Sequence, residues 1–430
     1  MIRQNFNADW TVEKGDGNSR MNSFLGNTQT KTVHLPYDAM IHEARTPDTK
    51  NGAQTGFYPG GEYIFQKHFT APQAWQGKPV SLVFEGVYQT ALVYLNGWLL
   101  TRNVNGYAEF TVEAGPYLKY GADNLLKVIA DNSLEPNSRW YTGSGIYRPV
   151  RLLVGNKVYL PQDTVRITTR EADEGFALLD VTAQVQSAST VTERVTLQQT
   201  ICREGTAVLT DRQNLLLQPG ESRTVSFRYC VDSPALWSPE NPNLYTSTMQ
   251  VLEGEEELDR EETGFGIRTL SIDAAHGVRI NGQTVKLRGA CIHHDNGILG
   301  AATLPDAEER RIRQLKEAGF NAIRSSQHPA GRALLDACDR YGVLVMDELS
   351  DVWNVRKNPY DYALYFEQDW KPTIQKMVAK DYNHPSVILY CVGNEISEAG
   401  SESGAETNRR LCNTFRELDP TRYTTNALNG

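Results

Sequence analysis

The chain has 430 residues, of which 40% are hydrophobic and 22% charged, and its formal net charge is −9. This length predicts two to four soluble domains of roughly 100 to 200 residues each. No long run of Lys or Arg offsets the negative charge, so neither nucleic acid nor an anionic membrane surface is an expected partner.

The N-terminus, MIRQNFNADWTVEKG, lacks the apolar core of a signal peptide. Nowhere does an apolar run reach the roughly 18 residues that a membrane-spanning helix needs. We therefore expect a protein that is not embedded in a membrane and that is intracellular, in the cytoplasm.

The first predicted domain covers residues 1–156. Between Glu62 and Val154, short segments such as VSLVFEG and TALVYLNGWLL alternate apolar and polar residues. This period of two is typical of strands in an antiparallel sheet. Asn96 and Gly97 lie between two such segments and indicate a two-residue hairpin. The pattern predicts a β-sandwich.

The second predicted domain covers residues 157–272. It is rich in Thr, Val and Gln, and turn sequences such as QPGES and SPENPN separate its strand patterns. An immunoglobulin-like β-sandwich of about 100 residues fits this stretch.

The third predicted domain covers residues 273–430, where strand and helix patterns alternate. After a hairpin at Asn281 and Gly282, helix patterns end near Gly319 and Gly342 and are followed by short apolar strands. Strands that are apolar throughout indicate a parallel sheet covered on both faces. Two architectures remain: an open doubly wound sheet and a (β/α)₈ barrel.

Polar residues follow four of these strands, as in SVILYCVGNE, which ends in an amide and a carboxylate. In both architectures, functional groups collect at the carboxyl ends of the strands. A charged residue at such a point also simply marks the exit of the chain into solvent. Four polar ends in succession favour the functional interpretation.

The sequence holds no dinucleotide-binding GxGxxG after a first strand, no phosphate-binding GxxxxGK[ST] and no GxSxG at a strand-to-helix turn. The six cysteines form no CxxC pair, which argues against zinc and predicts reduced thiols in the core: Cys202, Cys230, Cys291, Cys338, Cys391 and Cys412. Carboxylate and imidazole chemistry remains, the combination that glycoside hydrolysis uses.

Four segments, in order and spacing, resemble glycoside hydrolase family 2: KLRGACIHHD, FNAIRSSQHP, CDRYGVLVMDE and NHPSVILYCVGNE. Residues 131–153, DNSLEPNSRWYTGSGIYRPVRLL, resemble the end of that family's N-terminal jelly roll. The resemblance extends over essentially the whole chain. It implies a sugar-binding jelly-roll sandwich, an immunoglobulin-like sandwich and a catalytic TIM barrel.

The family resemblance also implies roles for residues at the strand ends. Glu395 corresponds to the acid/base glutamate of a retaining mechanism, and Asn394 to the amide that binds the sugar 2-hydroxyl. His293 matches a histidine that binds the transition state. Arg324 matches an arginine for which bracing neighbouring carboxylates is as good an interpretation as sugar contact.

Further substrate-binding candidates rest on weaker matches. Gln327 stands where many relatives have a histidine and can still donate a hydrogen bond to a hydroxyl. Asp351 and Trp353 are predicted to shape the sugar pocket, with a loop anchor as the alternative for Trp353. From the first domain, Arg139 and Tyr141 are predicted to reach the mouth of the barrel and contact sugar.

Several expectations concern what the chain lacks. Val352 and Asn354 stand where the best-known β-galactosidases carry magnesium ligands, so we expect no metal and no cofactor. A (β/α)₈ barrel needs roughly 250 residues, and the third domain is too short for one. We expect an incomplete barrel whose nucleophile lies beyond Gly430, with Glu348 as the alternative. Such a chain alone is predicted to be inactive, poorly stable or self-associating, through open sheet edges.

The resemblance favours a carbohydrate substrate and an exo-acting, retaining β-galactosidase, because HHDNGILGA is more similar to galactosidase members. The alternatives are a β-glucuronidase or β-mannosidase of the same family, or a non-catalytic carbohydrate-binding remnant.

Overall fold

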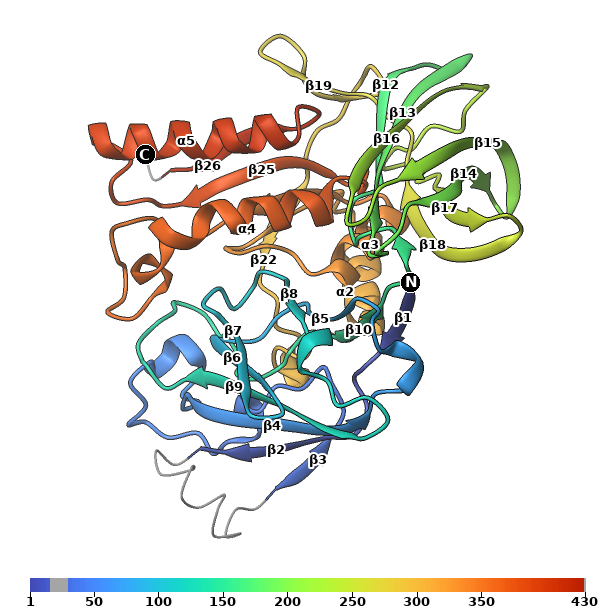
Figure 1. The fold of residues 1–430 in the computed structure, drawn as a ribbon. Coiled ribbons are helices and arrows are strands. Elements are labelled where there is room, and N and C mark those ends of the chain that lie inside the picture. The colour runs from blue at the N-terminus through green and yellow to red at the C-terminus, as the bar shows by residue number, and fades with distance from the viewer. Residues whose placement is uncertain (16–29, 429–430) are drawn as a thin grey trace.

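The computed structural model describes residues 1–15 and 30–428. Two β-sandwiches and a region of parallel strands and helices make up the fold (Figure 1). Among the described residues, no helix is both long enough and apolar enough to span a bilayer.

The first sandwich consists of two antiparallel sheets, with strand orders β3-β2-β4-β9-β6-β7 and β1-β10-β5-β8. Alternate residues of β5, Val80, Leu82 and Phe84, are buried in the core between the sheets. The hairpin predicted at Asn96 and Gly97 joins β6 to β7, and both residues have positive φ. The strands are β1 Ile2–Asn5, β2 Trp10–Lys14, β3 Lys31–Val33, β4 Gly61–Thr70, β5 Val80–Phe84, β6 Thr90–Leu95, β7 Trp98–Asn103, β8 Phe110–Glu113, β9 Asp123–Asn132 and β10 Val150–Val154.

The second sandwich has a separate core between a sheet in which β13 pairs with β11, β12 and β16 and a sheet of order β15-β14-β17-β18. In β16, buried and exposed residues alternate from Val225 to Asp232. The strands are β11 Val158–Tyr159, β12 Arg166–Ala172, β13 Phe176–Ser187, β14 Glu193–Arg203, β15 Thr206–Leu217, β16 Ser222–Asp232, β17 Tyr245–Glu253 and β18 Glu256–Phe265.

A small antiparallel sheet, with the predicted hairpin at Asn281 and Gly282, precedes five parallel strands in the order β22-β23-β24-β25-β26. This order follows the chain without a reversal, as in a (β/α)₈ barrel and unlike a doubly wound sheet. The elements are β19 Leu270–Asp273, β20 Gly277–Ile280, β21 Gln283–Thr284, β22 Gly289–Ile292, α2 Pro305–Glu317, β23 Ala322–Ser325, α3 Arg332–Tyr341, β24 Leu344–Glu348, α4 Phe366–Asp381, β25 Val387–Asn394, α5 Glu402–Leu418 and β26 Tyr423–Ala427.

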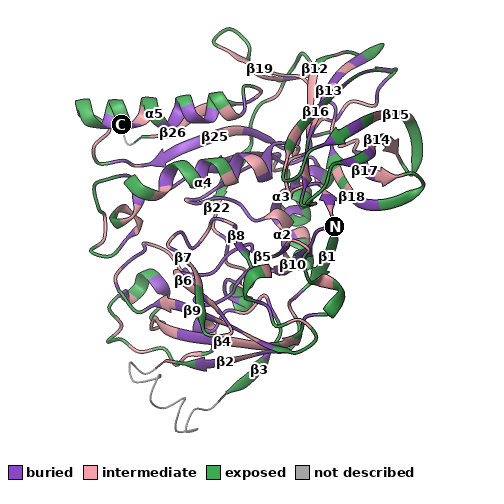
Figure 2. Ribbon diagram, viewed as in Figure 1, coloured by how far each residue is buried: buried purple, intermediate pink, exposed green. Residues whose placement is uncertain are grey.

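The helices pack against the parallel sheet in one apolar core, and a second cluster packs Leu344 and Ile388 against Trp237 and Ile280. β25 is buried along nearly its whole length, whereas α5 presents an exposed outer side (Figure 2). On the inner face of the sheet, a groove of about 300 Å³ is lined mainly by apolar side chains of β22 to β25. β22 and β26 each pair with a single neighbour, so the sheet is a partial barrel with two open edges.

The cysteines correct one expectation. All six are free thiols, but only Cys338, Cys391 and Cys412 are buried. Cys202 is half-buried, and Cys230 and Cys291 are exposed. In β16, alternation places Cys230 on the outward face between buried neighbours, and Cys291 lies on the open β22 edge strand.

Candidate active site

Four predicted residues meet at the carboxyl ends of β23 to β25. Arg324 in β23 donates from Nη2 to Oδ1 of Asn394 and to Oε1 of Glu348, both at 2.7 Å. Asn394, the last residue of β25, donates from Nδ2 to Oδ1 of Asp351 at 2.8 Å. Because buried strands hold these side chains, their mutual geometry is rigid. Arg324 therefore braces the site, the structural alternative that the sequence left open.

Asp351 is the centre of an ion-pair cluster. It accepts hydrogen bonds from Nζ of Lys357 at 2.9 Å and from the Arg139 guanidinium. Burial alone raises the pKa of the Asp351 carboxyl, but these cations and Asn394 outweigh it and lower that pKa below its usual value. Lys357 also donates to the backbone oxygen of Asn394 at 2.7 Å. Sequence reasoning missed Lys357, because no pattern marks its loop.

Arg139 crosses from the first sandwich to the strand ends. Its Nη2 and Nε donate to Oδ1 and Oδ2 of Asp351 at 2.7 and 3.1 Å, and Nη1 donates to Oε2 of Glu395 at 3.2 Å. The hydrogen bonds with Asp351, and then those with Glu395, raise the pKa of Arg139 despite its partial burial. Arg139 reaches the carboxyl ends of the strands, as predicted. Its partners in this structure are the carboxylates of Asp351 and Glu395.

Glu395 lies directly after β25 in an uncommon backbone conformation. Its φ is +45°, a region that non-glycine residues rarely adopt, and its N–H donates to the Ala427 oxygen at 2.7 Å. The chain thus turns out of the sheet at this residue. The side chain is 39% exposed, so solvent and substrate have access to the carboxylate.

Glu348 is a second carboxyl at these strand ends, but it is completely buried. Desolvation raises its pKa to about 7, against the opposing hydrogen bond and charge of Arg324. Its Oε2 has no hydrogen-bond partner among the described residues. This carboxyl lies beneath Arg324 and is poorly placed to attack a substrate.

His293 follows β22 and packs against an aromatic side chain of the first sandwich. The Trp140 ring stacks on it with 5.2 Å between ring centroids and 27° between planes. Burial lowers the pKa of His293, so the imidazole is neutral near pH 7. Nδ1 is buried and has no hydrogen-bond partner among the described residues.

Gln327 lines a small cavity between the first sandwich and the barrel, beside Asp351 and Tyr107. The cavity holds about 40 Å³, far below the roughly 300 Å³ of typical ligand sites. His328 is buried next to it and stacks on Tyr107 with 4.0 Å between centroids. The neighbourhood of Gln327 is therefore filled mainly by interdomain packing.

Two predicted sugar contacts are occupied by the protein itself. Trp353 is fully buried and donates from Nε1 to the Val392 oxygen at 2.8 Å, an arrangement that favours the loop-anchor alternative. Tyr141 donates its hydroxyl to Oδ2 of Asp38 at 2.6 Å, within the first sandwich. The structure does not bring Tyr141 to Glu395.

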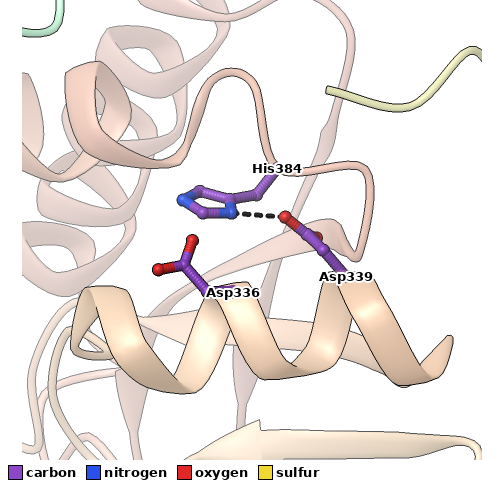
Figure 3. Close-up of side chains that lie close together, drawn as sticks. All are labelled: Asp336, Asp339 and His384. Carbon is purple, nitrogen blue, oxygen red and sulfur yellow. Dashed lines mark hydrogen bonds and ion pairs between the residues drawn. The ribbon is translucent and has the colours of Figure 1, made fainter. Parts of the chain in front are cut away.

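One group of potential metal ligands occurs among the described residues: Asp336, Asp339 and His384 (Figure 3). His384 Nδ1 lies 2.6 Å from Oδ2 of Asp339, whose other oxygen accepts the Ser386 N–H. This group precedes β25 and so lies at the opposite end of the strand from Glu395. Its contacts fix the loop that enters β25.

Of the two positions considered for magnesium, only Asn354 has a side-chain ligand atom. Val352 has no ligand atom in its side chain and is buried, and Asn354 is exposed, with its backbone N–H bonded to Oε1 of Glu398. The absence of a metal requirement stays a prediction.

Three family descriptions match consecutive parts of the chain. Residues 10–176 match "Glycosyl hydrolase 2 galactose-binding domain-like", and residues 158–268 match "Glycosyl hydrolases family 2". Residues 274–429 match "Glycosyl hydrolases family 2, TIM barrel domain". Together they account for both sandwiches and the partial barrel.

Individual relatives share this arrangement. A β-galactosidase of Bacteroides ovatus is 37% identical over 406 residues, covering 94% of this chain and 48% of the relative. A β-glucuronidase of Bacteroides fragilis is 27% identical over 426 residues, with coverages of 93% and 58%. The crystal structure of a family 2 member from Bacteroides cellulosilyticus superposes with a TM-score of 0.96 at 36% identity, covering 100% of this chain and 56% of the other. The chain thus spans about half the length of these relatives.

Proposed function

The chain belongs to glycoside hydrolase family 2, and on that premise we propose that the polypeptide that carries it is a retaining exo-β-glycosidase acting on terminal β-galactosides. The observation that carries this proposal is the Asn394–Glu395 pair at the end of β25, with its carboxylate accessible and held beside Arg139. A two-carboxylate mechanism of this class needs no metal or cofactor.

In the proposed mechanism, Glu395 protonates the departing glycosidic oxygen and later takes a proton from the attacking water. Asn394 and His293 bind sugar hydroxyls. The nucleophile must lie about 5 to 5.5 Å from the acid/base carboxyl. Of the carboxyls described at these strand ends, Glu348 is buried and Asp351 is ion-paired. We therefore place the nucleophile in barrel strands that follow the five described, and expect the 430-residue chain alone to be inactive.

Arg139 favours a neutral sugar over a glucuronide. A guanidinium is the group that best recognises a sugar carboxylate, but the side-chain hydrogen bonds of Arg139 go to Asp351 and Glu395. A glucuronate would have to displace one of these partners. Because one of the relatives named above is a β-glucuronidase, β-glucuronidase activity is the main competing proposal.

The test uses the complete polypeptide and, in parallel, the 430-residue chain, with aryl β-galactoside, β-glucuronide and β-mannoside as substrates. We expect the complete polypeptide to prefer the galactoside. Glu395→Gln should lower kcat/KM by a factor of at least about 10³, because the variant has no general acid. Azide rescue of the Glu395→Gln variant would support its role as acid/base.

A strong preference for the glucuronide would end the galactosidase proposal. Sugar binding without hydrolysis by the complete polypeptide would indicate a carbohydrate-binding protein instead. Hydrolysis by the 430-residue chain that Glu395→Gln abolishes would place a nucleophile inside it, and Glu348→Gln would then be the next variant.

A further inference from the structure

The first sandwich supplies a cation that contacts two carboxylates at once. Arg139 lies between β9 and β10, 256 positions before Glu395. It binds Asp351 through two hydrogen bonds of 2.7 and 3.1 Å, and Glu395 through one of 3.2 Å. The bidentate pair with Asp351 is the tighter, so Glu395 shares the guanidinium with a second carboxylate.

The members of this cluster differ in whether their charge changes during the proposed reaction. Asp351 also pairs with Lys357 at 2.9 Å, and mutual pairing raises the pKa of Arg139 and lowers that of Asp351. Both therefore stay ionised over the pH range in which an enzyme works. Glu395 is the member whose charge changes in a retaining reaction.

The proposed reaction has two such changes. In the first step the Glu395 proton passes to the glycosidic oxygen, which keeps the electron pair of the broken carbon–oxygen bond, and the nucleophile bonds to the anomeric carbon. Glu395 is then a carboxylate until a water gives it a proton, adds to that carbon and releases the nucleophile. A neighbouring cation stabilises the carboxylate but opposes the protonated form that starts the cycle.

We propose that Arg139 is a positioning residue that stabilises the carboxylate form of Glu395 between these steps, and that Asp351 limits this stabilisation by sharing the same guanidinium. This inference rests on the proposed function. It assigns to the first sandwich a part in the acid/base chemistry, in addition to any contact with sugar.

The other charged groups around Glu395 are spread over the neighbouring elements. Lys357 contacts Asp351 and the Asn394 backbone from the segment before α4, Arg324 in β23 pairs with Glu348 in β24, and His293 follows β22. Arg139→Met leaves these pairs in place, whereas Asp351→Asn also removes the carboxylate that pairs with Lys357. The two substitutions therefore change the charge next to Glu395 in opposite senses.

The experiment compares pH profiles of kcat/KM for the complete enzyme and two variants. Arg139→Met removes the cation, so the alkaline limb should move to higher pH. Asp351→Asn leaves the guanidinium unbalanced, so the same limb should move to lower pH. Arg139→Lys keeps the charge and should stay near the wild-type profile.

Opposite shifts exclude a general loosening of the site, which would act alike in both variants. The matched control is Arg228→Met, which removes an arginine that binds Asp180 through two nitrogens on the second sandwich. Its profile should not move. An unmoved limb in Arg139→Met, or shifts of the same sign in both site variants, would overturn the inference.

A titration without turnover separates this inference from the proposed function. Glutamate labelled with carbon-13 at the side-chain carboxyl reports Glu395 by NMR, and Glu395→Gln identifies its signal. The titration midpoint should rise in Arg139→Met and fall in Asp351→Asn. If the enzyme hydrolyses nothing, the proposed function fails, but the titration still tests whether Arg139 and Asp351 affect the Glu395 carboxylate. Equal midpoints in all three proteins would reject the further inference.

Discussion

The two β-sandwiches contact opposite ends of the same parallel strands. The first sends Arg139 to the carboxyl end, where it meets Asp351 and Glu395. The second contacts the amino end, where Trp237 donates to the Asp339 oxygen at 2.9 Å and Arg268 donates to the Pro385 oxygen at 2.6 Å. Since reacting groups in this architecture gather at the carboxyl ends, similar sandwiches acquire different roles: the first completes the site and the second supports the barrel.

The largest expected loss of stability comes from a substitution in the contact between the second sandwich and the barrel. Trp237 is fully buried and packs with Ile280, Leu344 and Ile388. Trp237→Ala should lower the free energy of unfolding by about 4 kcal/mol, through lost apolar burial and the cavity left behind. Denaturant titration measures this, with Trp98→Ala, at a 66% exposed position in the first sandwich, as the control. A stable Trp237→Ala protein would remove the support role.

The next effect concerns Arg332 in α3, which ties both sandwiches to the barrel. It donates to both Glu109 oxygens at 2.8 and 2.9 Å and to Oδ1 of Asp163 at 3.0 Å. Arg332→Met removes the cation shared by two half-buried carboxylates, although Glu109 keeps Arg151 and Asp163 keeps Gln162 as partners. We expect a loss of roughly 2 kcal/mol in unfolding free energy, measured by denaturant titration at pH 7.

The same ion pair predicts a pH dependence. Burial raises the pKa of Asp163, but the Arg332 guanidinium outweighs it and lowers that pKa to about 2. The unfolded value is about 3.9, so the stabilisation is present above pH 4 and is lost as pH falls from 4 toward 2. Thermal unfolding across this window should show a steeper loss in wild type than in Arg332→Met. Parallel curves would contradict the assignment.

A smaller effect is expected at His384, also on the supporting side. Its burial opposes the charged form, but the Asp339 carboxylate outweighs this and raises the pKa of His384 above 6.5. The stabilisation is therefore full below pH 6.5 and is lost as pH rises through the folded-state pKa. His384→Gln should remove that dependence, on the order of 1 kcal/mol. Denaturation midpoints at pH 6 and pH 9 test the sign.

The smallest effect on stability is expected at Arg139, at the carboxyl ends of the strands. Its side chain is 32% exposed, and Lys357 still pairs with Asp351 when it is removed. Arg139→Met should cost less than about 1 kcal/mol of unfolding free energy. A large destabilisation would blur the distinction between the two sandwiches, because Arg139 would then also act as a support.

The strand ends were the most predictable part of the site. The apolar run before Asn394 specifies a buried strand, and a buried strand must deliver the residues that follow it to one edge of the sheet. Glu395, Asn394 and Arg324 were found in this way, and the structure joins Arg324 to Asn394. The family resemblance supplied their roles, which periodicity alone does not carry.

Loop residues were less predictable. For Trp353 the sequence left a pocket residue and a loop anchor open, because a tryptophan near a site is equally suited to both; in the structure its side chain is fully buried. Lys357 was missed, since a loop lysine has no pattern of neighbours that distinguishes it from a solvated one. Cys230 occupies an outward position of β16. Which face of the strand it lies on depends on strand register, and the composition of the segment does not reveal that register.

The sequence by itself determined the two sandwiches, the alternation of strands and helices, and the position of Glu395 at a strand end, because these follow from local periodicity and turn chemistry. Only the tertiary structure decided the charge environment of that carboxylate. Arg139 and Asp351 meet across 212 positions of chain, and Coulomb interactions depend on distance through space. The chemistry of Glu395 is thus a property of domain packing.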